Sequence, residues 1–247
     1  MILAAGLGTR LRPLTDDRPK ALVEVAGRTL LELTLTRLKT SGISDVIINT
    51  HHFADKVAAY LSAHHNFGMH VEISSEEVLL DTGGGLKQAA HFFLTGDRGP
   101  DEPFLLHNVD VLSNIDFGAM LQRHCDTGAL ATLAVQDRPT SRYLLFDEKG
   151  FLCGRRSGVE GLTEQVRPAQ ELHPRAFSGI HVISPRIFDS MREQGVFSII
   201  PVYLRLAAAG QPISSFAADQ YYWRDLGRPA QIAAVTKDIE SGICNFL

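Results

Sequence analysis

The sequence predicts an α/β protein in which a doubly wound, mostly parallel mixed sheet carries a small antiparallel lobe. Over the first 125 residues, short apolar and β-branched runs alternate with helical patterns, which is typical of βαβ units. In the second half, strand patterns follow one another with hairpin turns between them. A chain of 247 residues and 27.1 kDa is long enough to bury a sizeable core.

The parallel part of the sheet is predicted from four runs that combine apolar and β-branched residues. These strand candidates are residues 2–5, 46–50, 71–74 and 104–107. The helix candidates between them are residues 29–40, 54–64 and 86–94. The first of these has leucines at amphipathic spacing and is followed by Gly42, a residue that often stands just after a helix end.

The antiparallel lobe is predicted from strand patterns in the second half. The candidates are residues 129–135, 143–146, 151–154 and 177–183. The stretch Asp147-Glu148-Lys149-Gly150 has the composition of a hairpin turn. Helices at 186–193 and 198–209, strands at 213–217 and 221–225, and a helix that begins near Pro229 complete the chain.

The composition excludes several classes of protein. Hydrophobic residues make up 45% and charged residues 21%, as in an ordinary globular chain. With 24 basic and 28 acidic residues, the net charge of -4 provides no broad positive surface for a nucleic acid. No apolar run approaches the roughly 20 residues that span a bilayer. The cysteines Cys125, Cys153 and Cys244 form no C-x-x-C pair, which predicts reduced thiols and a cytoplasmic location.

A glycine-rich loop, Gly6-Leu7-Gly8-Thr9-Arg10, directly follows the first predicted strand. Its glycines leave backbone N–H groups open to a phosphate. It is not a dinucleotide fingerprint, because Leu11 stands where the third glycine belongs, and no Gly-Lys-Ser/Thr follows to make a P-loop. Taken alone, these five residues are explained equally well by a plain glycine turn.

The residues after the loop add positive charge. Four cations, Arg10, Arg12, Arg18 and Lys20, fall within eleven positions. An unpaired cluster of this kind repels itself, and a triphosphate is a ligand that relieves the repulsion. The alternative is a solvated surface loop.

Two aspartates stand at predicted strand ends. Asp110 follows the strand at 104–107, and Asp225 closes the strand at 221–225. Open α/β sheets bind ligands at the carboxyl ends of their strands, and Mg²⁺ prefers carboxylate oxygens. The alternative for Asp110 is a helix N-cap or a turn residue. The two aspartates are 115 positions apart, so they share a metal only if the fold brings both strand ends to one crevice.

The stretch Leu3-Ala4-Ala5-Gly6-Leu7-Gly8-Thr9-Arg10-Leu11-Arg12-Pro13-Leu14-Thr15, followed by Pro19-Lys20-Ala21-Leu22, resembles the signature of the sugar-1-phosphate nucleotidyltransferases. The resemblance continues through Asp81-Thr82-Gly83-Gly84-Gly85, Asn108-Val109-Asp110, Phe177-Ser178-Gly179-Ile180 and Trp223-Arg224-Asp225-Leu226-Gly227. It implies the Rossmann-like nucleotide-diphospho-sugar transferase fold and one domain over 1–247. Residues 1–125 would be its nucleotide-binding half, and 126–247 its sugar-binding half with the C-terminal helices. The chain looks most like the short, single-domain forms, such as N-acetylmuramate-1-phosphate uridylyltransferases and mannose-1-phosphate guanylyltransferases.

The resemblance also implies a reaction, in which a sugar 1-phosphate attacks the α-phosphorus of a nucleoside triphosphate with Mg²⁺ as cofactor. Arg10, Lys20, Asp110 and Asp225 would be catalytic, and the two aspartates would hold the Mg²⁺. The residues that would bind the nucleotide are Leu3, Ala4, Gly6, Gly8, Thr9, Arg10, Gly83 and Gly84. Asn108 and Gly179 would bind the sugar.

The implied partners are UTP or GTP and a sugar 1-phosphate, with neither nucleic acid nor membrane, and a homodimer is compatible with the resemblance. Gly83 and Gly84 would open a gap beside the nucleobase. The alternative for this triple glycine is a flexible turn before a helix that begins at Leu86.

Two departures from the family pattern stand out. Val109 occupies the position before the first metal aspartate where relatives commonly have glycine, and its branched side chain would crowd a sugar or ribose. The family's Glu-Lys-Pro lysine has no counterpart, because Glu148-Lys149 is followed by Gly150; Arg155 or Arg156 is a candidate substitute. These departures leave open a catalytically silent nucleotide-binding regulatory protein. A choline-phosphate-type cytidylyltransferase also stays open, because those enzymes have the same fold and signature.

Overall fold

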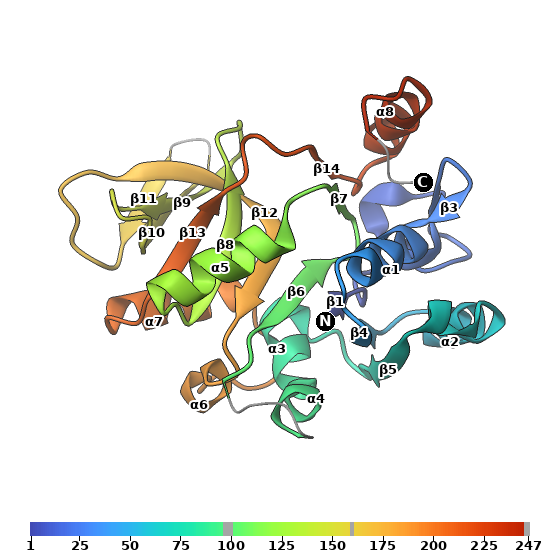
Figure 1. The fold of residues 1–247 in the computed structure, drawn as a ribbon, viewed down its shortest axis with the longest axis horizontal. Coiled ribbons are helices and arrows are strands. Elements are labelled where there is room, and N and C mark those ends of the chain that lie inside the picture. The colour runs from blue at the N-terminus through green and yellow to red at the C-terminus, as the bar shows by residue number, and fades with distance from the viewer. Residues whose placement is uncertain (96–100, 159–160, 245–247) are drawn as a thin grey trace. The chain divides into compact units, whose positions relative to one another are not determined.

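The computed structural model describes residues 1–95, 101–158 and 161–244, which form two compact units coloured along the chain in Figure 1. Unit 1 consists of Met1–Asp81, His107–Asn114 and Tyr222–Leu247, and unit 2 consists of Thr82–Leu106 and Ile115–Tyr221. The expected division near residue 125 does not coincide with these units. The reason is that the last strand, at residues 223–225, pairs with residues 111–113. The last helix packs on residues 24–25, and all of these segments belong to unit 1.

Unit 1 is built on parallel strands. These are β1 (Ile2–Leu3), β4 (Asp45–Thr50), β5 (His70–Ser75) and the last two residues of β6 (Phe104–Asn108), in the order β6-β1-β4-β5. The apolar runs predicted these four strands correctly. Strand β1 is shorter than the predicted 2–5, because the N–H of Ala4 donates to the Asn49 side chain and not to a neighbouring strand.

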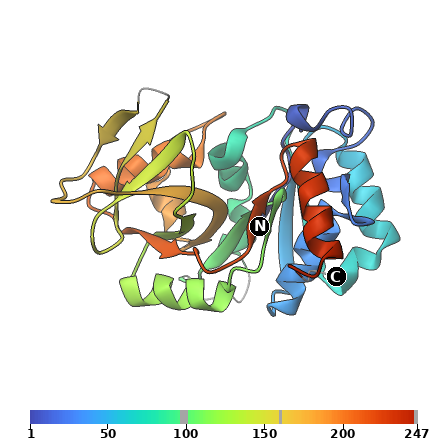
Figure 2. The ribbon, with the colours of Figure 1, turned by 90° about the horizontal axis from the view of Figure 1, so that it is seen from above.

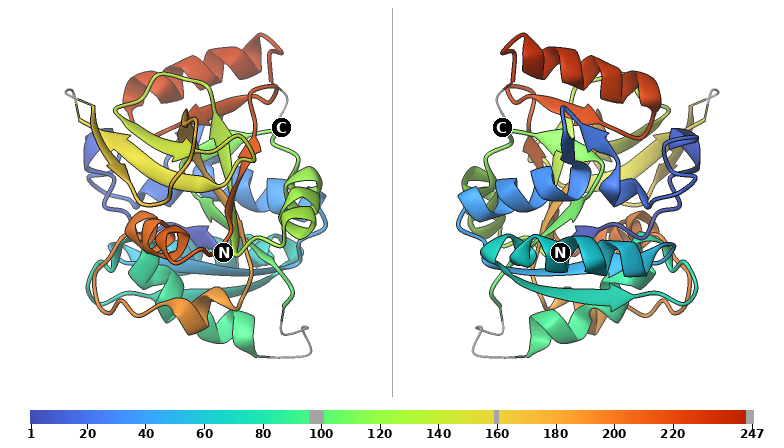
Figure 3. Two further views of the ribbon diagram at one scale, coloured as in Figure 1. Left: turned by 90° about the vertical axis from the view of Figure 1, so that its left-hand side faces the viewer. Right: turned by 90° about the vertical axis from the view of Figure 1, so that its right-hand side faces the viewer.

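The other elements of unit 1 surround these strands. They are the hairpin β2 (Glu24–Val25) and β3 (Arg28–Thr29), the pair β7 (Val111–Ser113) and β14 (Trp223–Asp225), the short turns η1 (Thr9–Leu11), η2 (Lys20–Leu22) and η3 (His65–Gly68), and the helices α1 (Leu30–Thr40), α2 (Ala54–Ala63) and α8 (Pro229–Glu240). Helices α1 and α2 run side by side in Figure 3, and the red helix α8 packs on β2 and β14. Helix α8 begins at Pro229, as the sequence predicts.

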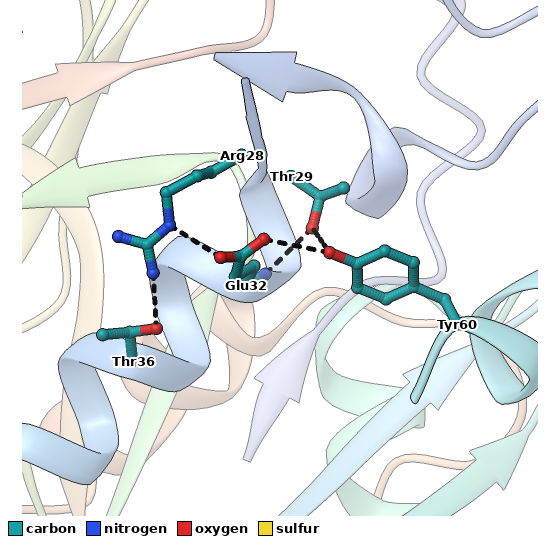
Figure 4. A network of polar contacts seen from close by, with 5 residues as sticks. All are labelled: Arg28, Thr29, Glu32, Thr36 and Tyr60. Atoms are coloured by element: carbon teal, nitrogen blue, oxygen red, sulfur yellow. Dashed lines mark hydrogen bonds and ion pairs between the residues drawn. The ribbon is translucent and has the colours of Figure 1, made fainter. Parts of the chain in front are cut away.

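A polar network holds the start of α1 against α2 (Figure 4). Thr29 caps the helix, since its Oγ1 accepts the N–H of Glu32 at 3.1 Å. The Glu32 carboxylate accepts from Arg28 Nε at 2.7 Å and from the Tyr60 hydroxyl at 3.0 Å. Arg28 also donates to Thr36 at 2.8 Å. One N-cap residue and one glutamate thus set where α1 begins and how α2 lies beside it.

Unit 2 is dominated by antiparallel pairing. Its strands are β8 (Ala131–Gln136), β9 (Arg142–Phe146), β10 (Leu152–Ser157), β11 (Leu162–Gln165), β12 (His173–Ile183), β13 (Ile213–Ala217) and the first three residues of β6. Strands β11-β10-β9-β12-β8 pair antiparallel in this order, and β13 joins β8 in parallel. The predicted hairpin turn is present between β9 and β10, where Gly150 has φ +82° and Asp147 Oδ1 accepts two backbone N–H groups.

The helices of unit 2 differ most from the expectation. They are α4 (Ala90–Leu94), α5 (Phe117–Thr127), α6 (Ile187–Ser190), α7 (Ile199–Ala208) and, from Thr82 on, α3 (Asp81–Gln88). The single helix expected at 86–94 is therefore two helices. Helix α5, which lies along β13 in Figure 2, was not predicted, although Asp116 caps its start and Gly128 follows its end with φ +58°.

Two further findings concern membrane-spanning helices and the cysteines. Among the described residues, none of the helices has the length and apolar character needed to cross a bilayer. Cys125, Cys153 and Cys244 are all free thiols, and Cys153 and Cys244 are buried.

A buried histidine makes the stability of the fold depend on pH. His124 is 2% exposed and lies 3.0 Å from Thr132 Oγ1 and 2.9 Å from Ser184 Oγ. Burial, together with the nearby Arg186 cation, lowers the pKa of His124 from 6.5 to about 4. Between these two values the unfolded chain binds a proton that the folded chain does not, so stability falls as pH drops through this window. We expect this residue to lower the free energy of unfolding by about 2 kcal/mol from pH 7 to pH 5.

Urea unfolding of the parent and of His124→Asn at both pH values measures the contribution. Between pH 7 and pH 5, the free energy of unfolding of His124→Asn should fall by about 2 kcal/mol less than that of the parent. The variant should keep the pH dependence that comes from His107, a second buried histidine whose pKa is lowered to about 4. An identical pH dependence in both proteins would contradict the assignment.

Candidate active site

The glycine-rich loop that follows β1 has a defined conformation. Gly8 has φ +64°, and a Cβ there would lie 2.9 Å from Thr15 Cγ2, so this position requires glycine. The Thr15 hydroxyl donates to the Gly8 carbonyl oxygen at 2.9 Å and so ties Gly8 to the residues that follow the loop. Gly6 and Thr9 are exposed, and no atom lies within 4 Å of the place a Cβ of Gly6 would take. The loop is thus a turn held at its base with its Gly6 side open.

The four cations of this segment do not form one unpaired cluster. Arg12 lies 3.5 Å from Asp16, and Arg18 lies 2.9 Å from Asp17, both on the exposed surface. The expectation of an unpaired cluster is therefore wrong for these two, because aspartates of the same loop neutralise them. Lys20 turns inward and forms an ion pair with Asp110, in which the two side chains are 13% and 15% exposed. Arg10 is exposed and has no ion pair with any described residue.

The two aspartates are brought together by strand pairing. Strand β14 runs antiparallel to β7 and places Asp225 opposite Val111, the neighbour of Asp110. The Leu226 N–H donates to the Asp110 carbonyl oxygen at 2.7 Å and continues this pairing. Asp110 caps no helix, since β7 follows it directly. The structure thus joins two strand ends that are 115 positions apart in the sequence.

Gly227 lies close to the side chains of both Asp225 and Arg10. A Cβ at position 227 would lie 2.7 Å from Asp225 Oδ1 and 3.0 Å from Arg10 Nη2. The Gly227 N–H also donates to Asp225 Oδ1 at 2.7 Å. In the sequence Gly227 is the last residue of Trp223-Arg224-Asp225-Leu226-Gly227, and no local pattern indicates its role. The crowding of both side chains around it explains why glycine stands there.

Asp110 and Asp225 each have one carboxylate oxygen that could bind a metal ion. One oxygen of Asp110 is taken by Lys20 and one of Asp225 by the Gly227 N–H, while within the described chain Asp110 Oδ1 and Asp225 Oδ2 accept no hydrogen bond. Among the residues that the structure describes, no group of three or more histidines, cysteines or carboxylates is placed to hold a metal. Mg²⁺ usually binds one or two carboxylates and takes its other ligands from phosphates and water. The donor set fits an ion that arrives with a triphosphate.

Gly83 and Gly84 belong to unit 2 and have a local explanation. Both are buried in the first turn of α3, so the alternative of a flexible turn is wrong. Their N–H groups donate to the Phe197 carbonyl oxygen at 2.9 and 3.1 Å. A Cβ at position 83 would lie 2.5 Å from the Phe197 ring. The Phe197 ring therefore fills the position that a Cβ at residue 83 would take.

The two sugar-binding candidates lie in different units. Asn108 ends β6 in unit 1, opposite Leu3 of β1. Gly179 lies in unit 2, is buried, and has φ +75° at a bulge in β12. Of the candidate substitutes for the missing lysine, Arg155 pairs with Glu164 at 2.7 Å and Arg156 lies over the Tyr143 ring at 5.0 Å. Both arginines thus have partners within the β9–β11 strands.

Val109 does not present its side chain as expected. It is 3% exposed, so it is a packed residue and does not crowd an open binding surface. We expect Val109→Gly to lower the free energy of unfolding by roughly 2 kcal/mol, through lost burial and added backbone freedom, and to leave the ranking of sugar acceptors unchanged. Urea unfolding and an acceptor screen test this, with Val109→Ala separating the burial effect from the glycine effect. A changed ranking at unchanged stability would place Val109 against the substrate.

A family model described as nucleotidyl transferase matches residues 1–242. N-acetylmuramate alpha-1-phosphate uridylyltransferase of Caulobacter vibrioides is 36% identical over an alignment of 253 positions, gaps included, which covers 98% of this chain and 97% of the relative. The enzyme of the same name from Neisseria meningitidis serogroup B is 32% identical over 209 residues, 82% of each chain. The crystal structure of HddC from Yersinia pseudotuberculosis shares the fold, with a TM-score of 0.76 and 21% identity over 96% of this chain and 97% of that one. These matches show that the chain belongs to the nucleotidyl transferase family and is a nucleotidyltransferase.

Proposed function

We propose that this nucleotidyltransferase makes a nucleotide sugar, by transfer of a uridylyl group from UTP to N-acetylmuramate α-1-phosphate. The observation that carries the reaction class is the convergence of Arg10, Lys20, Asp110 and Asp225 in unit 1. Two cations and two carboxylates with open oxygens, beside an exposed glycine loop, provide what a triphosphate and its metal require.

The reaction needs positioning and charge stabilisation, and it needs no covalent nucleophile on the protein. An oxygen of the sugar 1-phosphate attacks the α-phosphorus of the nucleoside triphosphate, the bond to the β-phosphate breaks, and pyrophosphate leaves. The exposed backbone at Gly6 and Thr9 binds phosphate oxygens. Arg10, which has no ion pair with the described part of the chain, stabilises the negative charge that develops on the pyrophosphate.

Lys20 has a second role through its partner. In the structure its ammonium group neutralises Asp110. We infer that Lys20 moves to the triphosphate when the nucleotide binds, which frees the Asp110 oxygen that it occupies. Asp110 and Asp225 would then hold Mg²⁺, which, when bound, neutralises phosphate oxygens at the reacting centre.

The choice of base and sugar rests on likeness to the relatives. The enzymes from Caulobacter and Neisseria, both above 30% identity, carry a name that specifies UTP chemistry and N-acetylmuramate α-1-phosphate. GTP with mannose 1-phosphate is the competing pair within the same family. A choline-phosphate cytidylyltransferase would instead use CTP and a phosphorylated amino alcohol. A silent regulatory protein would bind a nucleotide without releasing pyrophosphate.

A pyrophosphate-release screen separates these functions. The full-length protein is incubated with Mg²⁺, each of the four nucleoside triphosphates, and a panel that includes N-acetylmuramate, N-acetylglucosamine, glucose and mannose 1-phosphates and phosphocholine. We expect the highest kcat/KM with UTP and N-acetylmuramate α-1-phosphate. Preference for another pair would overturn the substrate assignment, and nucleotide binding without pyrophosphate release from any pair would overturn the enzymatic one.

A further inference from the structure

A buried asparagine terminates strand β1 at the point where the glycine-rich loop begins. Asn49 is the fifth residue of β4, pairs with Leu3 in the strand register, and is 3% exposed. Its Oδ1 accepts the N–H of Ala4 at 2.7 Å. A side chain, and not a backbone carbonyl, therefore receives the first N–H beyond the β1 strand. This hydrogen bond holds the backbone at Ala4, two residues before the glycine-rich loop begins at Gly6.

A buried glutamate holds Asn49 in turn. Glu76 directly follows β5 and is 5% exposed. Its Oε1 accepts from Asn49 Nδ2 at 2.6 Å, and its Oε2 accepts the N–H of Leu80 at 2.8 Å. Both carboxylate oxygens are thus used, one toward the glycine-rich loop and one toward the segment that leads into α3.

The chemistry of this network indicates more than packing. Burying a carboxylate is costly, and within the described chain no cation pairs with Glu76 to offset that cost. A charged acceptor forms stronger and better-directed hydrogen bonds to N–H groups than a neutral one does. The carboxylate also forces the Asn49 amide into a single orientation, with Nδ2 toward Glu76 and Oδ1 toward Ala4.

We propose that Asn49 and Glu76 are positioning residues for the nucleotide, which act through the backbone of Ala4 and Leu80 and do not touch the reacting atoms. This inference rests on the proposed function, because it assigns the glycine-rich loop to the triphosphate. It adds two residues, one strand apart, that neither the cation pattern nor the aspartate pattern pointed to. The chain Leu80, Glu76, Asn49, Ala4 lies entirely within unit 1.

The network can be tested by reversing one hydrogen bond. In Asn49→Asp alone, a carboxylate faces the Glu76 carboxylate, and in Glu76→Gln alone, one amide N–H group is left opposite another donor. In the double variant the aspartate at position 49 accepts from Ala4 and from the new amide at position 76, whose oxygen accepts from Leu80. All three hydrogen bonds are then restored with the same net charge. The double variant is the decisive protein, because the single ones can lose stability as well.

The readouts are KM for UTP, KM for the sugar 1-phosphate, kcat and the melting temperature, measured well below the lowest melting temperature. We expect each single variant to raise KM for UTP by at least about tenfold, the scale for one unsatisfied buried group. The effect on KM for the sugar should be smaller, and the double variant should return to within about threefold of the parent. Thr34→Val is the matched control, since it removes a buried side-chain hydrogen bond of the same unit, to Leu30 in α1.

The outcomes distinguish the hypotheses. Variants that melt earlier but keep the parental KM for UTP, as Thr34→Val should, would overturn the positioning role and leave a structural one. A double variant as impaired as the product of the singles would overturn the hydrogen-bond reversal on which the proposal stands. A parent protein that releases no pyrophosphate from any substrate pair would instead contradict the proposed function. In that case, direct calorimetric binding of UTP to parent and variants would still test the network.

Discussion

Asp225→Asn is expected to lower turnover by at least about 10²-fold and to raise the Mg²⁺ concentration needed for half-maximal rate. The substitution removes a negative charge that a divalent cation requires and nearly preserves side-chain volume. Its Oδ1 can still accept the Gly227 N–H, so the local turn should survive. Pyrophosphate release measured against Mg²⁺ concentration gives both quantities, and circular dichroism checks the fold.

Asp110→Asn should have the same effect, and the double variant should be little worse than either single one. The β7–β14 pairing places the two aspartates next to each other, and residues that act as a unit are not additive. Asp55→Asn is the control, because this exposed carboxylate lies in the first turn of α2 in the same unit. Losses that multiply independently, or an Asp225→Asn enzyme with parental Mg²⁺ dependence, would show that Asp225 is a turn residue only.

Lys20→Met is expected to lower turnover by at least about 10²-fold while increasing the affinity of the nucleotide-free protein for a divalent cation. The two effects have opposite directions because Lys20 serves the triphosphate during the reaction and occupies Asp110 before it. Methionine keeps the apolar stem and removes the charge. Titration with Mn²⁺ in the absence of nucleotide, followed by electron paramagnetic resonance, measures metal affinity independently of activity.

Arg10→Ala should lower turnover to a similar extent without the gain in metal affinity, since Arg10 neutralises neither carboxylate by an ion pair in the described structure. Arg12→Ala is the control, because Arg12 belongs to the same loop and pairs with the exposed Asp16. Parental turnover in both Lys20→Met and Arg10→Ala would remove the loop from the active site. Weaker Mn²⁺ binding in Lys20→Met would contradict the exchange of partners at Asp110.

The missed elements show where sequence patterns are weak. Helix α5 carried clear end signals in Asp116 and Gly128, yet its apolar face is narrow and polar residues fill the rest of it. The expected helix begins at Leu86, whereas α3 begins at Asp81 and includes the triple glycine, although glycine disfavours a helix in isolation. In the folded chain, the Phe197 carbonyl oxygen receives the N–H groups of Gly83 and Gly84, and the Phe197 ring fills the space beside Gly83. Tertiary contacts thus outweighed local preference.

The sequence by itself determined the local features of this protein: most strands of both units, the start of α8 at Pro229, and the position of the glycine-rich loop after β1. It also named the four charged candidates Arg10, Lys20, Asp110 and Asp225. These depend on periodicity, end residues and residue type, which act within a few positions of the chain. Only the tertiary structure decided that Lys20 meets Asp110, that Asp225 lies opposite Val111, and that Asn49 and Glu76 hold Ala4. The physical reason is that each of these contacts follows from the register between strands distant in sequence, and no local pattern encodes that register.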